Sequence, residues 1–420
     1  MTITLRKVVT TLIFAFTTLV FVLFILFDTY TWGKYVFFGL SVCILLLGSV
    51  ISHGEIMPRF SPYIVLNILF IGFTLCSSLW AFDTSDSMLM ARTLIQIFLC
   101  AYAVYITYLN IPELDATVLI KAVMWAGYIV AIYALSFYGL DKMMAAGRKS
   151  NLRIENDFAN VNTIGMACAL SCVLQINLRN LRPQERIFPS ALFMIPSAVV
   201  IAATQSRKAF VFFVVGALGY AFVKAQKSNK GLFIKVVKTL FWILILALIL
   251  YWILRLNAFD GIRKRMEYML NAVLDKGKID HSTILRNNLK ELGLTWFVKY
   301  PIGGIGIANP HILAIQYYNF DAYLHNNFVE LLCGGGIIGF CLYYAMYFYL
   351  FKQLWKYRNI DKQRVAFFAL WLGLMLAMNY GMVTYYSKSQ NFYLMIHFVN
   401  VFDLKRKALK LCRTKNTLTQ

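Results

Sequence analysis

One hydrophilic stretch of about 70 residues, 255–325, interrupts an otherwise nearly unbroken series of apolar segments. The segments reach the length of roughly 17–22 residues that a helix needs to cross the hydrocarbon core of a bilayer. Because hydrocarbon offers the backbone no hydrogen-bond partners, such segments must be helices. The sequence therefore predicts an all-α polytopic membrane protein with one long aqueous loop.

The composition agrees with this class, since 60% hydrophobic and only 14% charged residues cannot cover the surface of a soluble protein. A scan for apolar runs gives about twelve spans, at 8–27, 35–51, 62–81, 88–109, 117–138, 160–177, 187–204, 208–223, 236–254, 326–350, 364–379 and 386–402. The predicted organisation is nine spans within 1–254, the loop 255–325, three spans within 326–402 and a basic tail at 403–420.

Basic residues indicate how the chain is oriented. More than half of the 41 lysines and arginines fall in the two termini and in every second short connection, which the positive-inside rule assigns to the cytoplasm. Both termini are then cytoplasmic and the loop 255–325 is external. Much of the net charge of +22 is a topology signal, so no nucleic-acid partner is predicted. Within the loop, 261–274 and 282–298 space their apolar residues as helices do.

The polar loop ends in His325, Asn326 and Asn327, immediately before the last three spans. In one interpretation an asparagine caps the next helix and the histidine is an interfacial residue. In the other, His325 is a general base, because an imidazole titrates near neutral pH and can take a proton from an acceptor hydroxyl. We also predict that Asn326 contributes to substrate binding.

Two arginines are predicted to face the same aqueous side as this histidine. Arg207 lies in the very short connection TQSRK, where a charged side chain is a functional candidate unless it reaches the lipid headgroups. Arg286 lies on the amphipathic segment 282–298, where an arginine is usually solvated. Two guanidinium groups and one imidazole at a membrane edge favour chemistry on a lipid-bound anion.

Glycines mark a third feature of the loop. The string PIGGIGIANP at 301–310 contains Gly303, Gly304 and Gly306, which predict a turn whose N–H groups can approach a phosphate or a sugar. A tight re-entry against the membrane is an equally open alternative. The sequence holds no HExxH, GxxxxGK[ST] or DxD motif, so we predict neither a metal site nor a cofactor.

Four strings follow one another within roughly residues 76–345: SSLWAFDTSDSMLMARTLIQIFL, FANVNTIGMACAL, TQSRKAF and HNNFVELLCGGGIIGF, the last preceded by PIGGIG. In this order and spacing they resemble the O-antigen ligase and O-antigen polymerase superfamily. The chain departs from the pattern at Cys333 and Gly334, where that superfamily commonly has a polar or acidic residue before its glycines.

The resemblance implies a GT-C-like, metal-independent, inverting glycosyltransferase of the bacterial cytoplasmic membrane. Its donor would be a glycan on undecaprenyl diphosphate, and its acceptor a sugar hydroxyl of a glycan or glycolipid at the external face. Carried over by motif, Arg207 and Arg286 would hold the donor diphosphate and His325 would act as the base. A flippase and a chain-length regulator are the further partners expected of such an enzyme.

The residues leave three functions open. A polymerase of O-antigen or capsular polysaccharide joins one lipid-linked repeat unit to another, whereas a ligase transfers the finished chain to lipid A core. We favour the polymerase, because the external surface is only moderately basic and shows no distinct lipopolysaccharide-binding feature. A lipid-linked oligosaccharide flippase is the third alternative, but it needs charged residues at the midplane of several helices, and the predicted spans are nearly free of charge.

Overall fold

The computed structural model describes residues 3–27, 30–57, 60–148, 159–181, 190–227, 232–274 and 281–418, and in this part of the chain the regular structure is entirely helical. The α-helices are α1 (Ile3–Leu26), α2 (Thr31–Ile51), α3 (Pro62–Ser77), α4 (Thr84–Asn110), α5 (Ala116–Tyr138), α6 (Leu140–Arg148), α7 (Val161–Leu181), α8 (Met194–Thr204), α9 (Arg207–Ala225), α10 (Leu232–Leu254), α11 (Asp260–Leu274), α12 (His281–Lys299), α13 (Pro310–Tyr318), α14 (Asn327–Lys356), α15 (Lys362–Met378) and α16 (Lys388–Leu418). Two short 3₁₀ helices, η1 (Ser190–Phe193) and η2 (Asn257–Phe259), precede α8 and α11.

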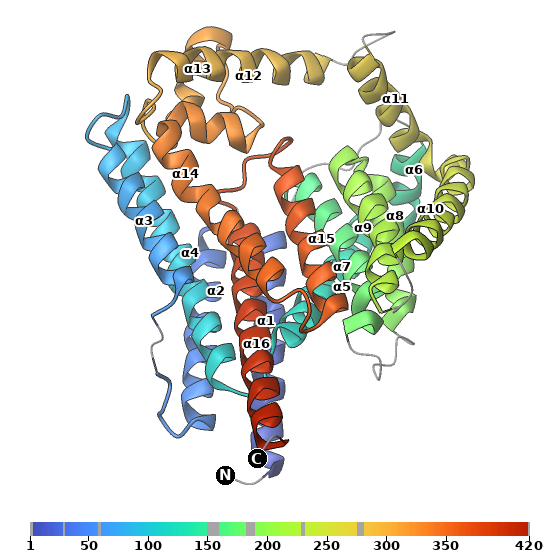
Figure 1. The fold of residues 1–420 in the computed structure, drawn as a ribbon. Coiled ribbons are helices and arrows are strands. Elements are labelled where there is room, and N and C mark those ends of the chain that lie inside the picture. Colours follow the sequence, from blue (N-terminus) through green and yellow to red (C-terminus); the bar gives the residue numbers. More distant parts are fainter. Residues whose placement is uncertain are drawn as a thin grey trace.

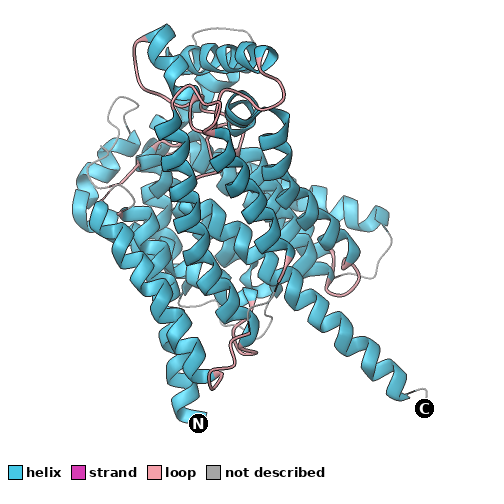
Figure 2. Cartoon of the chain, turned by 90° about the vertical axis from the view of Figure 1, so that its left-hand side faces the viewer, coloured by secondary structure: helices cyan, strands magenta, loops and turns pink. Residues whose placement is uncertain are grey.

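The long helices stand side by side in one bundle (Figure 1). α1 begins and α16 ends at one end of this bundle, whereas α12 and α13 lie across the opposite end, which we call the α12 end. A view turned by 90° also shows both chain ends at one end of the bundle and helices lying across the opposite end (Figure 2). The two helices expected at 261–274 and 282–298 coincide with α11 and α12.

Six helices of the described residues are long and apolar enough to cross a membrane, and they belong to α1, α4, α5, α7, α9 and α14. Shorter apolar helices lie at Tyr35–Ile51, Pro62–Ser77 and Ala191–Thr204. Each predicted span overlaps a helix, although the start of the span 187–204 lies outside the described residues. The helical, polytopic membrane architecture therefore agrees with the structure, and the number of about twelve crossings stays a prediction.

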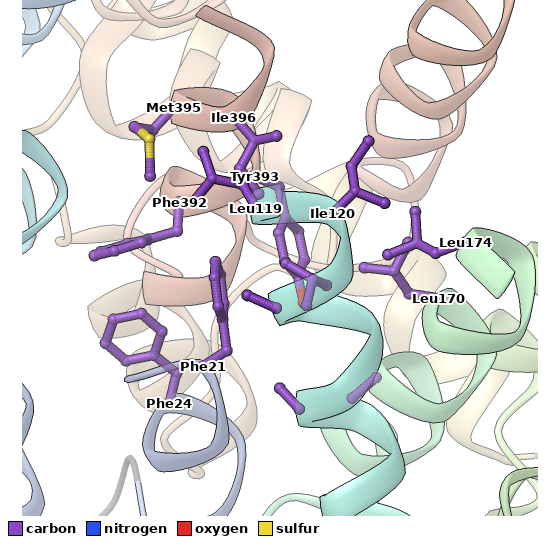
Figure 3. Close-up of a cluster of buried hydrophobic side chains, with 14 of the residues drawn as sticks. Phe21, Phe24, Leu119, Ile120, Leu170, Leu174, Phe392, Tyr393, Met395 and Ile396 are labelled. Atoms are coloured by element: carbon purple, nitrogen blue, oxygen red, sulfur yellow. The ribbon is translucent and has the colours of Figure 1, made fainter. Parts of the chain in front are cut away.

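The apolar core joins the first and last helices of the chain (Figure 3). Phe21 and Phe24 of α1 pack on Phe392 of α16, with ring centroids 5.7 and 4.7 Å apart. Leu119 of α5 and Leu174 of α7 are fully buried in the same cluster. Lipid chains are as apolar as these side chains, so close packing rather than exclusion from water holds such helices together.

α14 is broken at Gly336, where φ is 58° and ψ is −163°. The break lets the segment 301–307 pack against the helix backbone to backbone, and the Ile305 N–H donates to the carbonyl oxygen of Cys333 at 3.0 Å. A Cβ atom at Gly336 would collide with the Ile302 carbonyl. The three glycines 334–336 thus allow close contact between α14 and the glycine-rich segment 301–307.

We predict that Gly336→Ala destabilises the protein by about 1–3 kcal/mol, because it combines a positive φ with a backbone clash. Gly373→Ala is the matched control, since a Cβ atom at Gly373 in α15 meets nothing within 4 Å. The thermal unfolding midpoint in detergent should fall for the first variant and stay near the wild-type value for the second. Equal midpoints for both variants would show that the break in α14 is not needed for stability.

Candidate functional site

A second apolar cluster fixes α12 on α14. Leu289, Leu324 and Val329 are buried in it, and Leu285, Leu292 and Trp296 of α12 pack against them. Gly293 lets the two helices approach, because a Cβ atom there would collide with the side chain of Val329 in α14. With one face of α12 held in this way, the opposite face borders a cavity.

This cavity lies at the α12 end and has a volume of about 490 Å³. We call it the cationic cavity; its lining residues are Arg207, Lys208, Val211, Thr283, Arg286, Asn287, Lys290, His325, Ala377, Met378, Tyr380 and Gly381. Four of these side chains are basic and none is a carboxylate. The structure thus brings together Arg207, Arg286 and His325, the three residues singled out in the sequence. The volume is within the usual range for small-molecule sites, about 300–1,000 Å³.

A tight turn between α8 and α9 places Arg207. Gln205 adopts a left-handed conformation with φ of 48°, and the Ser206 side chain caps α9. The Arg207 guanidinium reaches across to α12, where it donates to the hydroxyls of Thr283 at 3.4 Å and Ser282 at 3.5 Å. Arg207 and Arg286 therefore face one cavity although they come from helices far apart in the sequence.

His325 stands at the end of the loop in a left-handed conformation, with φ of 57°. The preceding Leu324 N–H donates at 2.8 Å to the Glu330 carboxylate, which is only 4% exposed. The imidazole lies against the ring of Tyr323, with centroids 4.3 Å apart. Its Nδ1 atom is buried and makes no hydrogen bond to any described residue. Glu330 therefore fixes the backbone that presents the imidazole to the cavity.

Burial, and then the positive charges of Arg286 and Lys208, lower the pKa of His325 from 6.5 to about 4. This pKa lies below the near-neutral value expected from the sequence, because the sequence shows neither the burial nor the neighbouring cations. The imidazole is neutral at pH 7 and able to accept a proton. An anion bound in the cavity would raise this pKa again.

The asparagines after His325 have structural partners. Asn326 caps α14, and its side-chain oxygen accepts the N–H groups of Phe328 and Val329 at 2.9 and 3.2 Å. This confirms the helix-cap interpretation for Asn326, whose role in substrate binding stays a prediction. The side-chain oxygen of Asn327 accepts the Thr384 N–H at 2.7 Å. Asn327 thereby ties α14 to the loop between α15 and α16, a role that the sequence did not suggest.

The loop glycines lie outside the lining of the cationic cavity. The Gly303 carbonyl accepts a hydrogen bond from Trp80 Nε1 at 3.1 Å, and Gly304 packs on the backbone of Gly334. Gly306, with φ of 103°, packs against Ala81. The positive φ and the close backbone contacts explain why glycine is needed at Gly304 and Gly306. The glycan-binding role predicted for them stays a prediction.

Two further lysines of the cationic cavity were not singled out in the sequence. Lys208 directly follows Arg207, and Lys290 lies one helical turn after Arg286 on the same face of α12. Lys290 donates to the Tyr380 hydroxyl at 3.4 Å and lies 4.8 Å from the centre of its ring. The i, i+4 spacing in the sequence indicates that Lys290 lies on the same helix face as Arg286, so Lys290 could have been predicted from it.

The profile of the family described as O-antigen ligase matches residues 192–344. The resemblance to the O-antigen ligase and polymerase superfamily is thereby confirmed. The match includes Arg207, Arg286 and His325, and it supports a membrane enzyme of the ligase or polymerase type. A search of curated proteins finds no match to the chain. In the described residues, no group of three or more His, Cys, Asp or Glu side chains could hold a metal ion, and metal independence stays a prediction.

Proposed function

We propose that the protein is a glycosyltransferase that moves a glycan from undecaprenyl diphosphate to a sugar hydroxyl, as an O-antigen or capsular polysaccharide polymerase. The observation that carries this proposal is the cationic cavity, in which Arg207 and Arg286 lie beside a neutral His325. We place the α12 end at the external face of the cytoplasmic membrane and both termini in the cytoplasm, following the distribution of basic residues.

The donor binds through its diphosphate in this proposal. A diphosphate that links a lipid to a sugar carries two negative charges, and guanidinium groups match its oxygens with two parallel hydrogen bonds. Arg207 and Arg286 supply these groups from different helices, while Lys208 and Lys290 add two positive charges in the same lining. No step requires a metal ion, because the arginines neutralise the charge that develops on the leaving group.

In this proposal, glycan transfer uses the His325 imidazole as the base and the neighbouring cations to stabilise the leaving diphosphate. The His325 imidazole accepts the proton of the acceptor hydroxyl while the hydroxyl oxygen forms a bond to the anomeric carbon of the donor sugar. The bond from that carbon to the diphosphate oxygen breaks, and its electron pair leaves with the diphosphate. Attack from the face opposite the leaving group inverts the configuration at the anomeric carbon.

A ligase is the second candidate, because the description of the matching family is O-antigen ligase. Purified protein in lipid nanodiscs, supplied only with the lipid-linked repeat units of its own strain, should produce a ladder of longer lipid-linked glycans. A product that forms only after lipid A core is added would instead establish the ligase. Failure to transfer glycan to either acceptor, from a donor that binds, would contradict the glycosyltransferase proposal as a whole.

Replacing either arginine should remove most of the activity. We expect Arg207→Ala and Arg286→Ala to lower the transfer rate by about 10²–10³, the usual cost of removing one group that stabilises developing charge. Lysine at either position keeps the charge but loses the paired hydrogen bonds, so it should restore activity only in part. Arg358→Ala, exposed near the C-terminal end of α14, is the control. Wild-type rates for both arginine variants would rule out their diphosphate role.

His325 should give the reaction a distinctive pH dependence. The base works only when neutral, so the rate falls as the pH drops through its pKa. For kcat/KM, which reports the free enzyme, we expect this fall near the pKa of about 4 rather than near 6.5. For kcat it should occur at higher pH, since the bound diphosphate raises the pKa.

The matching substitution is His325→Ala, which should lower kcat by about 10²–10⁴ and leave donor affinity largely unchanged. His53→Ala, an exposed position in the turn after α2, is the control. The His325→Ala variant could instead keep the wild-type rate per folded molecule and still lose activity as the pH falls. That result would assign the base to another group.

A further inference from the structure

A second cavity, with a volume of about 300 Å³, adjoins the cationic cavity at the α12 end. It is formed by the first turns of α7, α9 and α16, the end of α15 and the loop 382–387. Lys208 lines both cavities. Tyr323 lines the second cavity, and its ring contacts the imidazole of His325, which lines the first. The two cavities therefore meet at the proposed base.

The second cavity differs from the first in its chemistry. Its polar lining consists mainly of amide and hydroxyl side chains: Asn160, Asn162, Thr163, Tyr323, Tyr386, Ser387, Ser389, Gln390 and Tyr393. Lys208 is the only charged side chain in the lining, and Trp371 adds a further aromatic ring. Amides and hydroxyls suit the hydroxyl groups of an uncharged sugar, and aromatic rings can cover its apolar face.

Gln390 is the most informative of these residues. Its side chain is 6% exposed, and its Oε1 atom is buried without a hydrogen-bond partner among the described residues. A buried acceptor left unpaired is costly, so native proteins nearly always give it a partner. Because Gln390 lines the second cavity, a donor group of a bound molecule can supply this partner.

We propose that the second cavity binds the acceptor, through an uncharged sugar ring that donates a hydrogen bond to Gln390. This inference rests on the glycosyltransferase function proposed above. If the diphosphate leaves into the cationic cavity, the acceptor hydroxyl must approach the anomeric carbon from the opposite direction. The second cavity can supply such an approach, because it is separate from the cationic cavity and adjoins it at Tyr323 and His325.

The test separates acceptor binding from donor binding. Its acceptor probe is an alkyl glycoside of the repeat unit, which has no diphosphate and cannot serve as donor. Gln390→Leu should raise the KM for this probe about 2- to 10-fold, the effect of one lost hydrogen bond. The dissociation constant of the lipid diphosphate donor should stay unchanged. Gln353→Leu, in the last turns of α14 and lining neither cavity, is the matched control.

A second variant, Thr163→Phe, fills the cavity from α7 and should abolish transfer to the probe while donor binding persists. Retained donor binding also shows that the variant is folded. An unchanged KM in Gln390→Leu, with full transfer by Thr163→Phe, would overturn the acceptor site and leave the glycosyltransferase proposal intact. A loss confined to donor affinity would assign the cavity to the donor glycan. Absence of donor binding and transfer in the wild type would instead refute the function itself.

Discussion

Backbone pairing between the segment 301–307 and the broken middle of α14 determines where the functional groups lie. A helix break inside a membrane protein exposes N–H and C=O groups that have no water to bind. Here the Ile305 N–H binds the Cys333 carbonyl, and the Ile337 N–H binds the Pro301 carbonyl. Each such group left unpaired would cost about 1–3 kcal/mol. The two glycine-rich strings are thus one structural unit, and α12 and the loop leading to His325 are attached on either side of it.

Placing four basic side chains in the lining of the cationic cavity has an electrostatic cost, because like charges repel one another. The same field lowers the pKa of His325. An anion relieves the repulsion and restores the basicity of the imidazole. In the proposed reaction, a bound diphosphate would therefore make His325 a stronger base, whereas a neutral ligand in this cavity would not.

The sequence predicted much of the fold because apolar length and hydrogen-bond satisfaction leave a membrane chain few choices. It also placed Arg207 correctly at the short connection before α9. Arg286 is different: an arginine on an amphipathic helix is usually solvated, and the family resemblance was the stronger reason to assign it a role. Lys208 and the shifted pKa of His325 could not be predicted, because both depend on which distant helices meet at the α12 end. The contacts of Gly304 with Gly334 were hidden for the same reason.

Two adjoining cavities of unlike chemistry also bear on how a polymerase would sort its substrates. In a polymerase, the donor and the acceptor are the same kind of molecule, a repeat unit on a lipid diphosphate. Each could therefore compete for the binding site of the other. They differ in which end reacts: the donor reacts beside its diphosphate, whereas the acceptor reacts at a sugar far from it. A cavity lined by Arg207 and Arg286 favours the first end, and one lined by Gln390 and aromatic rings favours the second. On this proposal, the difference in charge between the two cavities would direct the donor diphosphate to one and the acceptor sugar to the other, and His325, at the edge of the cationic cavity, would act only when both are bound.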